Sequence, residues 1–164
     1  MLSLLNRTLC EIMKQMFSMD FIAQNSNKNN CLPDCEGIMS FIHFNSSDFR
    51  GDICLSMSHE SCRRMLAQHN LTANSNDFEI LMRSTVGEVS NTLAGEFLAL
   101  PQVRQTFGHV EVHPPIILDD HVKDNPAFPL VQGYCGKIQF DEIEILTFIS
   151  DNFSSLQESD QYSA

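Results

Sequence analysis

The chain has 164 residues, of which 43% are hydrophobic, so it can bury a core and is expected to form one domain. Its formal net charge of −11 argues against nucleic acid or an anionic membrane as a partner, because both bind cationic surfaces. No apolar run approaches the roughly 20 residues of a membrane-spanning helix, and the first residues lack the pattern of a signal peptide. Among the six cysteines, Cys10, Cys54 and Cys62 fall within helix or strand patterns. We therefore expect a cytoplasmic protein with reduced thiols.

The first third of the chain predicts one helix and one hairpin. Apolar residues recur at intervals of three and four in residues 2–21, which is typical of an amphipathic helix. The polar residues 24–30 break this pattern and predict a loop. Residues 37–44 and 50–57 are rich in strand-forming residues, and residues 45–48 between them have turn chemistry, so the two runs predict a β-hairpin.

Two further helices follow in the middle of the chain. Ser58 is a suitable N-cap for a helix over residues 59–69, which Asn70 is expected to close. Residues 74–77 provide a second capping segment, at the start of a long helix over residues 77–100. Pro101 is expected to stop that helix, with a loop after it.

The last part of the chain predicts strands. Residues 110–113 and 116–118 appear extended in pattern around Pro114 and Pro115, and a polar loop is expected after them at residues 119–126. Alternation in residues 128–139 and 143–150 predicts two antiparallel strands that meet at a turn. This order of elements predicts an α+β fold, an antiparallel-rich sheet with helices packed on it. We expect a single domain over residues 1–150 and an acidic flexible tail over residues 151–164.

The long helix has two different faces. At about 100° per residue, one face carries an apolar stripe and is expected to face the core: Met82, Val86, Val89, Leu93, Phe97 and Leu100. Ser84, Glu88, Asn91 and Gly95 fall within roughly 60° of one another on the far side. A polar outer face alone needs no function. However, Asn and Gly each cost roughly 0.5 to 1 kcal/mol in a helix relative to Ala, so their presence here hints at use.

The same residues begin a longer pattern: Ser84, three residues, Glu88, two residues, Asn91, twenty-two residues, Pro114. This pattern resembles the signature of the CheC/CheX/FliY phosphatases of bacterial chemotaxis, and the order of elements resembles that family over nearly the whole chain except the tail. Members of the CheC and FliY type carry two such helices, whereas CheX carries one. Here the first helix has Glu11 followed by Lys14 and no Asn, so the chain is most similar to the CheX branch.

The resemblance implies a function and a partner. The expected reaction is hydrolysis of the aspartyl phosphate on a CheY-like receiver domain, with Mg²⁺ supplied by the receiver and no cofactor in this chain. It also implies a homodimer formed through an extended sheet. Asn91 is expected to orient the attacking water, because an amide can donate and accept hydrogen bonds without acting as a base. Glu88 is expected to dock against a lysine of the receiver.

The remaining residues of the pattern receive supporting roles. Gly95 would let the backbone of the partner approach closely. Ser84 is expected to cap or orient the helix, and Pro114 to shape the adjoining loop, both as structural support.

Other functions remain open or are disfavoured. A non-catalytic adaptor that binds a receiver or another signalling protein could use the same fold. A metal site is not expected, because the pairs Cys31 and Cys35, His59 and Cys62, and His109 and His113 lie on different elements and none has the tight CxxC spacing. No cysteine lies beside an activating pattern, and the chain has no glycine-rich phosphate-binding loop.

Overall fold

The fold is known from a computed structural model that describes residues 1–29, 37–46, 49–71, 75–118 and 133–150. The described residues form four helices and a seven-stranded antiparallel sheet, an α+β fold as predicted. Along the chain the elements are α1 (Leu2–Phe17), β1 (Ile22–Asn29), β2 (Gly37–Asn45), β3 (Arg50–Ser58), α2 (His59–Gln68), α3 (Ser75–Ala99), α4 (Pro101–Phe107), β4 (Glu111–Val112), β5 (Ile116–Leu118), β6 (Gly133–Phe140) and β7 (Ile143–Ser150). Within these residues, none of the helices is both long enough and apolar enough to span a membrane.

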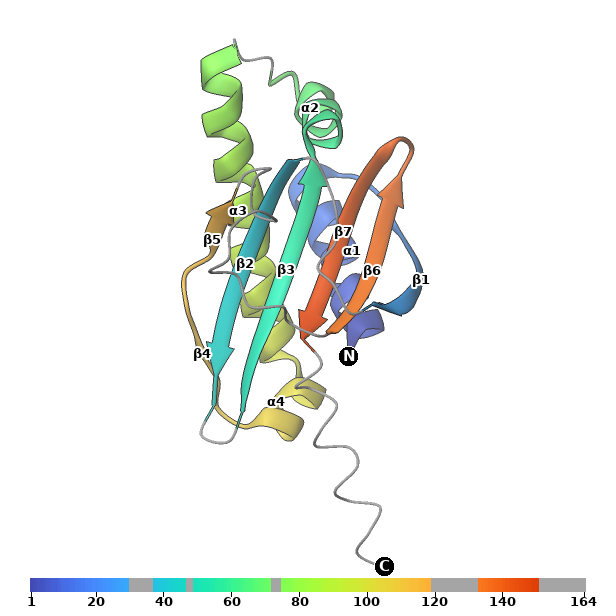
Figure 1. Cartoon of the computed structure of the whole chain (residues 1–164). Helices are drawn as coiled ribbons and strands as arrows, with labels where there is room; N and C mark the ends of the chain where they lie inside the picture. Colours follow the sequence, from blue (N-terminus) through green and yellow to red (C-terminus); the bar gives the residue numbers. More distant parts are fainter. Residues whose placement is uncertain (30–36, 47–48, 72–74, 119–132, 151–164) are drawn as a thin grey trace, which may run out of the picture.

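The strands follow one another across the sheet in the order β1-β6-β7-β3-β2-β4, and β5 also pairs with β2 (Figure 1). All pairs are antiparallel, and the β2–β3 hairpin keeps one register from Gly37 opposite Ser58 to Asn45 opposite Arg50. Helix α3 runs along β2, and α1 lies against α3 and β6 on the same face of the sheet (Figure 1). The long helix is therefore held between the other helix and one edge of the sheet.

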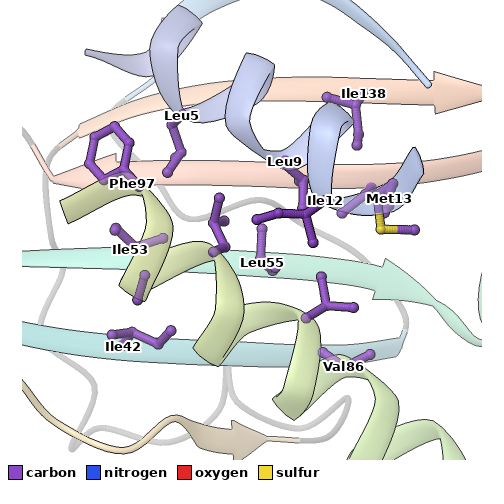
Figure 2. Packing of buried hydrophobic residues seen from close by; sticks show 14 of the residues in the cluster. Leu5, Leu9, Ile12, Met13, Ile42, Ile53, Leu55, Val86, Phe97 and Ile138 are labelled. Atoms are coloured by element: carbon purple, nitrogen blue, oxygen red, sulfur yellow. The ribbon is translucent and has the colours of Figure 1, made fainter. Parts of the chain in front are cut away.

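The main core lies between α1, α3 and the sheet (Figure 2). Leu5, Leu9 and Ile12 of α1 are fully buried, at the spacing of three and four that the sequence shows. They meet buried Leu93 and Phe97 of α3 and the alternate inward residues of β3, such as Ile53 and Leu55. Burial of each such side chain contributes about 1.5–3 kcal/mol, so this layer fixes the position of α3.

Two predicted helix boundaries have clear causes. Ser58 caps α2, since its Oγ accepts a hydrogen bond of 3.1 Å from the Ser61 N–H, and Asn70 follows the helix with a positive φ of 56°. Helix α1 ends at Phe17, four residues before the predicted end. Ser18 adopts the left-handed conformation there, with φ 53°, and its N–H bonds back to the carbonyl groups of Lys14 and Met13.

The predicted loop over residues 24–30 is wrong for the residues that the structure describes. Residues 22–29 form strand β1, which pairs antiparallel with β6 at the edge of the sheet. The register shifts between Gln24 and Asn27, as at a β-bulge, and the Gln24 side chain donates a hydrogen bond to Gln139. Backbone pairing to β6 outweighs the low strand propensity of this polar segment, because propensity is a weak preference at an edge strand.

The predicted loop after Pro101 is also wrong, because residues 101–107 form helix α4. Pro101 occupies the first helical position, where its missing N–H costs nothing, so it starts a helix as well as ending one. Val103 and Phe107, one turn apart, are buried, and the Phe107 ring stacks on Phe49 with centroids 4.5 Å apart. The apolar spacing and the following Gly108 were signals of a short helix.

Strands β4, β5, β6 and β7 confirm the predicted extended segments within the described part of the chain. Asp141, at the predicted turn between β6 and β7, has a φ of 50°. Several predictions fall wholly or partly on residues outside the described ranges: most of the hairpin turn, the start of the second capping segment, the polar loop at 119–126, residues 128–132, the tail, and Cys31 and Cys35.

Candidate functional site

Helix α3 has the two faces that the sequence predicts. Five residues of its apolar stripe are buried, and the sixth, Leu100, is half-buried just past the end of the helix: Met82, Val86, Val89, Leu93 and Phe97. This stripe packs against α1 and the sheet (Figure 2), so rotation of α3 about its axis would expose several large apolar side chains. The direction of the opposite face is thereby fixed.

Ser84, Glu88, Asn91 and Gly95 are all exposed on that opposite face, and together they are called the α3 ridge below. Glu88 and Asn91 are three residues apart, which places their side chains next to each other on the helix surface, with Cβ atoms about 5–6 Å apart. Within the described part of the chain, neither side chain has a hydrogen-bond or ion-pair partner. A carboxylate and an amide therefore stand side by side, available to another molecule.

Strand β5 braces the helix beside the ridge. A Cβ atom on Gly87 would lie 3.5 Å from Cδ1 of Ile117, which is an ordinary van der Waals distance. At Gly95, by contrast, a Cβ atom would meet nothing within 4 Å. Gly87 therefore faces the neighbouring strand, and Gly95 faces open space.

Pro114 lies on a different element from the rest of the predicted site. It is exposed in the connection between β4 and β5, next to His113, whose N–H donates a 2.9 Å hydrogen bond to the carbonyl oxygen of His43 in β2. The structure thus brings four of the five predicted site residues together on one helix face. Pro114 belongs to the segment that runs along the edge of β2.

Helix α1 offers a comparison with the α3 ridge. Arg7, Glu11, Lys14 and Ser18 are exposed at the same intervals as the four ridge residues. Lys14 occupies the place that corresponds to Asn91, and its Nζ lies 2.7 Å from Asp20 Oδ1. This hydrogen bond raises the pKa of Lys14. Helix α1 therefore presents a paired cation where α3 presents an unpaired amide.

The histidines and cysteines considered as metal ligands do not form a cluster within the described ranges. His113 Nε2 lies 3.0 Å from Asn45 Nδ2, and its ring is 5.9 Å from that of His43. Cys62 is buried in α2, while His59 is only partly buried at the start of the same helix.

Sequence reasoning missed two residues on this surface. Arg104 of α4 and His109 lie beside Gly95 around a cavity of about 430 Å³. Neither residue belongs to the spaced pattern that singled out the ridge. They reach the end of the ridge only because α4 folds back after Pro101, and the signal for that short helix was the apolar pair Val103 and Phe107.

Comparisons with known proteins agree with this architecture. Residues 38–123 match the family described as chemotaxis phosphatase CheX, and the comparison with curated proteins gives no match. A chain of the CheX-CheY-BeF3-Mg²⁺ complex from Borrelia burgdorferi superposes with a TM-score of 0.70 at 14% identity, over 91% of this chain and 96% of that one. A CheC-like superfamily protein from Shewanella sp. PV-4 gives 0.70 at 14%, over 91% and 95%. FliY from Thermotoga maritima gives 0.63 at 12%, over 96% and 90%. At such low identities these structures establish the shared fold.

Proposed function

Because the chain belongs to the CheX family of chemotaxis phosphatases, we propose that it hydrolyses the aspartyl phosphate of a CheY-like receiver domain. The observation that carries this proposal is the exposed pair of Glu88 and Asn91 on the α3 ridge, with no partner of their own in the described part of the chain. A convex ridge suits a substrate that is itself a protein, because the ridge can enter the phosphorylated pocket of a receiver.

The reaction needs little from this chain beyond geometry. A water oxygen attacks phosphorus while the bond between phosphorus and the acyl oxygen breaks, which yields the aspartate carboxylate and inorganic phosphate and releases a proton. The Mg²⁺ that belongs to the receiver neutralises charge on the phosphoryl group. The missing contribution is a water held in line with the breaking bond.

Asn91 is assigned to orient that water. Its amide oxygen can accept a hydrogen bond from the water, and its NH₂ group can donate one to a phosphoryl oxygen. Because an amide does not titrate near neutral pH, this role predicts no basic limb in the pH profile that arises from this residue. The fixed orientation of α3 supports the role, since the amide starts from a helix that cannot rotate.

Glu88 is assigned to docking. A carboxylate close to a phosphoryl group is repelled unless a cation lies between them, so an ion pair with a lysine of the receiver fits better than a role as general base. Gly95 would allow close approach of the partner. Ser84 and Pro114 are assigned to structural support of the helix and of the adjoining segment.

The test is to mix the protein with phosphorylated receivers and to follow phosphate release. Asn91→Ala should lower kcat by roughly 10²-fold, the scale expected when a reacting group is no longer positioned. Glu11→Ala is a matched control, because Glu11 is equally exposed on α1 and should leave the rate unchanged. Unchanged hydrolysis by the Asn91 variant, with its fold intact, would refute the assignment.

A non-catalytic adaptor predicts a different result in the same assay. An adaptor would bind the receiver without accelerating loss of phosphate, and Asn91→Ala would then change affinity but no rate. The pairing of a carboxylate with an unpaired amide on the ridge favours catalysis, because simple docking has no need of the amide.

A further inference from the structure

A cavity lies at the C-terminal end of the α3 ridge. It has a volume of about 430 Å³ and lies where the end of α3, helix α4 and the segment leading into β4 meet. Its lining includes Gly95 and Leu98 of α3, Arg104 of α4, His109 and Val112. Gly95 belongs both to the ridge and to the cavity, so a molecule that covers the ridge also reaches the cavity mouth.

The cavity carries basic side chains in a strongly acidic protein. Arg104 and His109 are both exposed, and neither has an ion-pair partner among the residues that the structure describes. Several other basic side chains have partners: Lys14 with Asp20, Lys137 with Glu144, and Arg64 with Glu60. With a net charge of −11 on the whole chain, an uncompensated arginine here makes a local site for an anion.

We infer that this cavity receives a carboxylate side chain of the receiver, which binds Arg104 and His109 while Glu88 binds the lysine of the receiver. The inference rests on the proposed function, because it takes the receiver as the molecule that covers the ridge. The apolar side chains of Leu98 and Val112 would contact the aliphatic part of an acidic side chain, and the guanidinium group would bind its carboxylate.

Two contacts of opposite charge would determine the orientation of the partner. Glu88 and Gly95 are seven residues apart, which corresponds to about 10 Å along the helix. A partner with a cation at one position and a carboxylate about that far away matches the surface in one direction only, and the reversed placement brings like charges together. This local pattern also offsets the lack of long-range attraction between an acidic phosphatase and a phosphorylated site.

The test compares Arg104→Glu with Arg7→Glu. Arg7 is equally exposed on α1 and has no ion-pair partner among the described residues, so both variants change the net charge by the same amount. Affinity is measured by titration against a receiver loaded with Mg²⁺ and beryllofluoride, and KM and kcat are measured with the phosphorylated receiver. Arg104→Glu should raise Kd and KM by about tenfold or more and leave kcat unchanged, Arg104→Lys should restore part of the loss, and Arg7→Glu should change Kd less than twofold.

Each outcome decides between readings. Equal effects of Arg104→Glu and Arg7→Glu would show a general charge effect and overturn the inference, as would no effect from Arg104→Glu in a folded variant. A change in sedimentation coefficient with unchanged Kd would assign the cavity to a second copy of this chain and would also overturn it. If the wild-type protein binds the loaded receiver but does not release phosphate, the phosphatase proposal fails, and the Kd ratio still decides the role of the cavity.

Discussion

Asn91 and Gly95 are residues that a helix interior disfavours, yet α3 carries both on its exposed face. Neither is explained by packing: Asn91 has no partner in the described part of the chain, and a side chain at Gly95 would meet nothing within 4 Å. The cost of these residues to the helix is therefore not compensated within the chain. A partner that uses the amide and approaches the bare backbone would compensate it at the moment of binding.

Gly95→Ala separates folding from docking. The substitution should raise the free energy of unfolding by about 0.5–1 kcal/mol, because Ala favours the helix and its methyl group meets no other atom. It should also weaken binding of the receiver, because the methyl group lies where the partner approaches.

Gly87→Ala is the matched control for that experiment. It should stabilise the same helix by a similar amount, since its methyl group would rest against Ile117 at 3.5 Å, and it should leave receiver binding unchanged. Denaturant unfolding and titration with the receiver measure the two effects. If Gly95→Ala stabilised the fold and bound the receiver as tightly as Gly87→Ala does, the ridge would not be the docking surface at Gly95.

Glu88→Gln tests docking by charge. The variant keeps the shape of the side chain and removes its charge, so KM should rise by about two- to fivefold while kcat changes little, as expected for an exposed ion pair. The difference from wild type should shrink as salt is raised from about 0.01 M to about 0.3 M, because the Debye length falls from about 30 Å to below 10 Å. A salt-independent fall in kcat would instead indicate a role in the chemical step.

At the scale of elements, the position of α3 depends on the layer that α1 forms with the sheet. Asn6 of α1 is buried, and its Oδ1 accepts a 2.6 Å hydrogen bond from Oγ1 of Thr147 in β7. Gly136 of β6 leaves room for this contact: a Cβ atom there would lie 2.5 Å from Nδ2 of Asn6 and 3.0 Å from Oγ1 of Thr147. The glycine thus permits a polar contact that seats α1 on the sheet.

Gly136→Ala should therefore destabilise the protein by about 1–3 kcal/mol, the usual cost of forcing extra volume into a packed site. Denaturant unfolding measures the change. Once corrected for the folded fraction, kcat should equal that of wild type, because the substitution lies away from the α3 ridge. A variant as stable as wild type would contradict the close contact between α1 and the sheet.

At the scale of the whole molecule, the sheet offers two edges of unequal length. One edge is β1, whose bounds span residues 22–29, and the other is made of the short strands β4 and β5. A homodimer through an extended sheet, which stays a prediction, would gain more backbone hydrogen bonds at β1. Ile22 at the start of β1 is 72% exposed, which adds apolar surface to that edge.

The dimer prediction can be tested at this edge. Ile22→Lys with Ala23→Lys should shift the protein toward the monomer in sedimentation velocity, because lysines on an edge strand discourage pairing between chains. Ile116→Lys on the opposite edge is the control, because Ile116 is also exposed but lies on a three-residue strand. An unchanged sedimentation coefficient in the β1 variant, or a monomeric wild type, would contradict pairing through β1.

The sequence by itself determined the fold class, the central helix and the exposed direction of Ser84, Glu88, Asn91 and Gly95. Helical periodicity is a local property, so an apolar stripe of period 3.6 already states which face is covered and which is open. The hairpin of β2 and β3 and the Ser58 cap were predictable for the same reason, since neighbouring residues make the contacts that define them.

Only the tertiary structure decided what depends on partners far along the chain. Strand β1 exists because β6, more than a hundred residues later, accepts its hydrogen bonds, and no local pattern in the polar segment 24–29 indicates that pairing. Helix α4 and the cavity of Arg104 and His109 likewise depend on the packing of Phe107 against Phe49 and on the return of the chain toward Gly95. Such contacts are selected by the free energy of the whole fold, which sequence spacing does not contain.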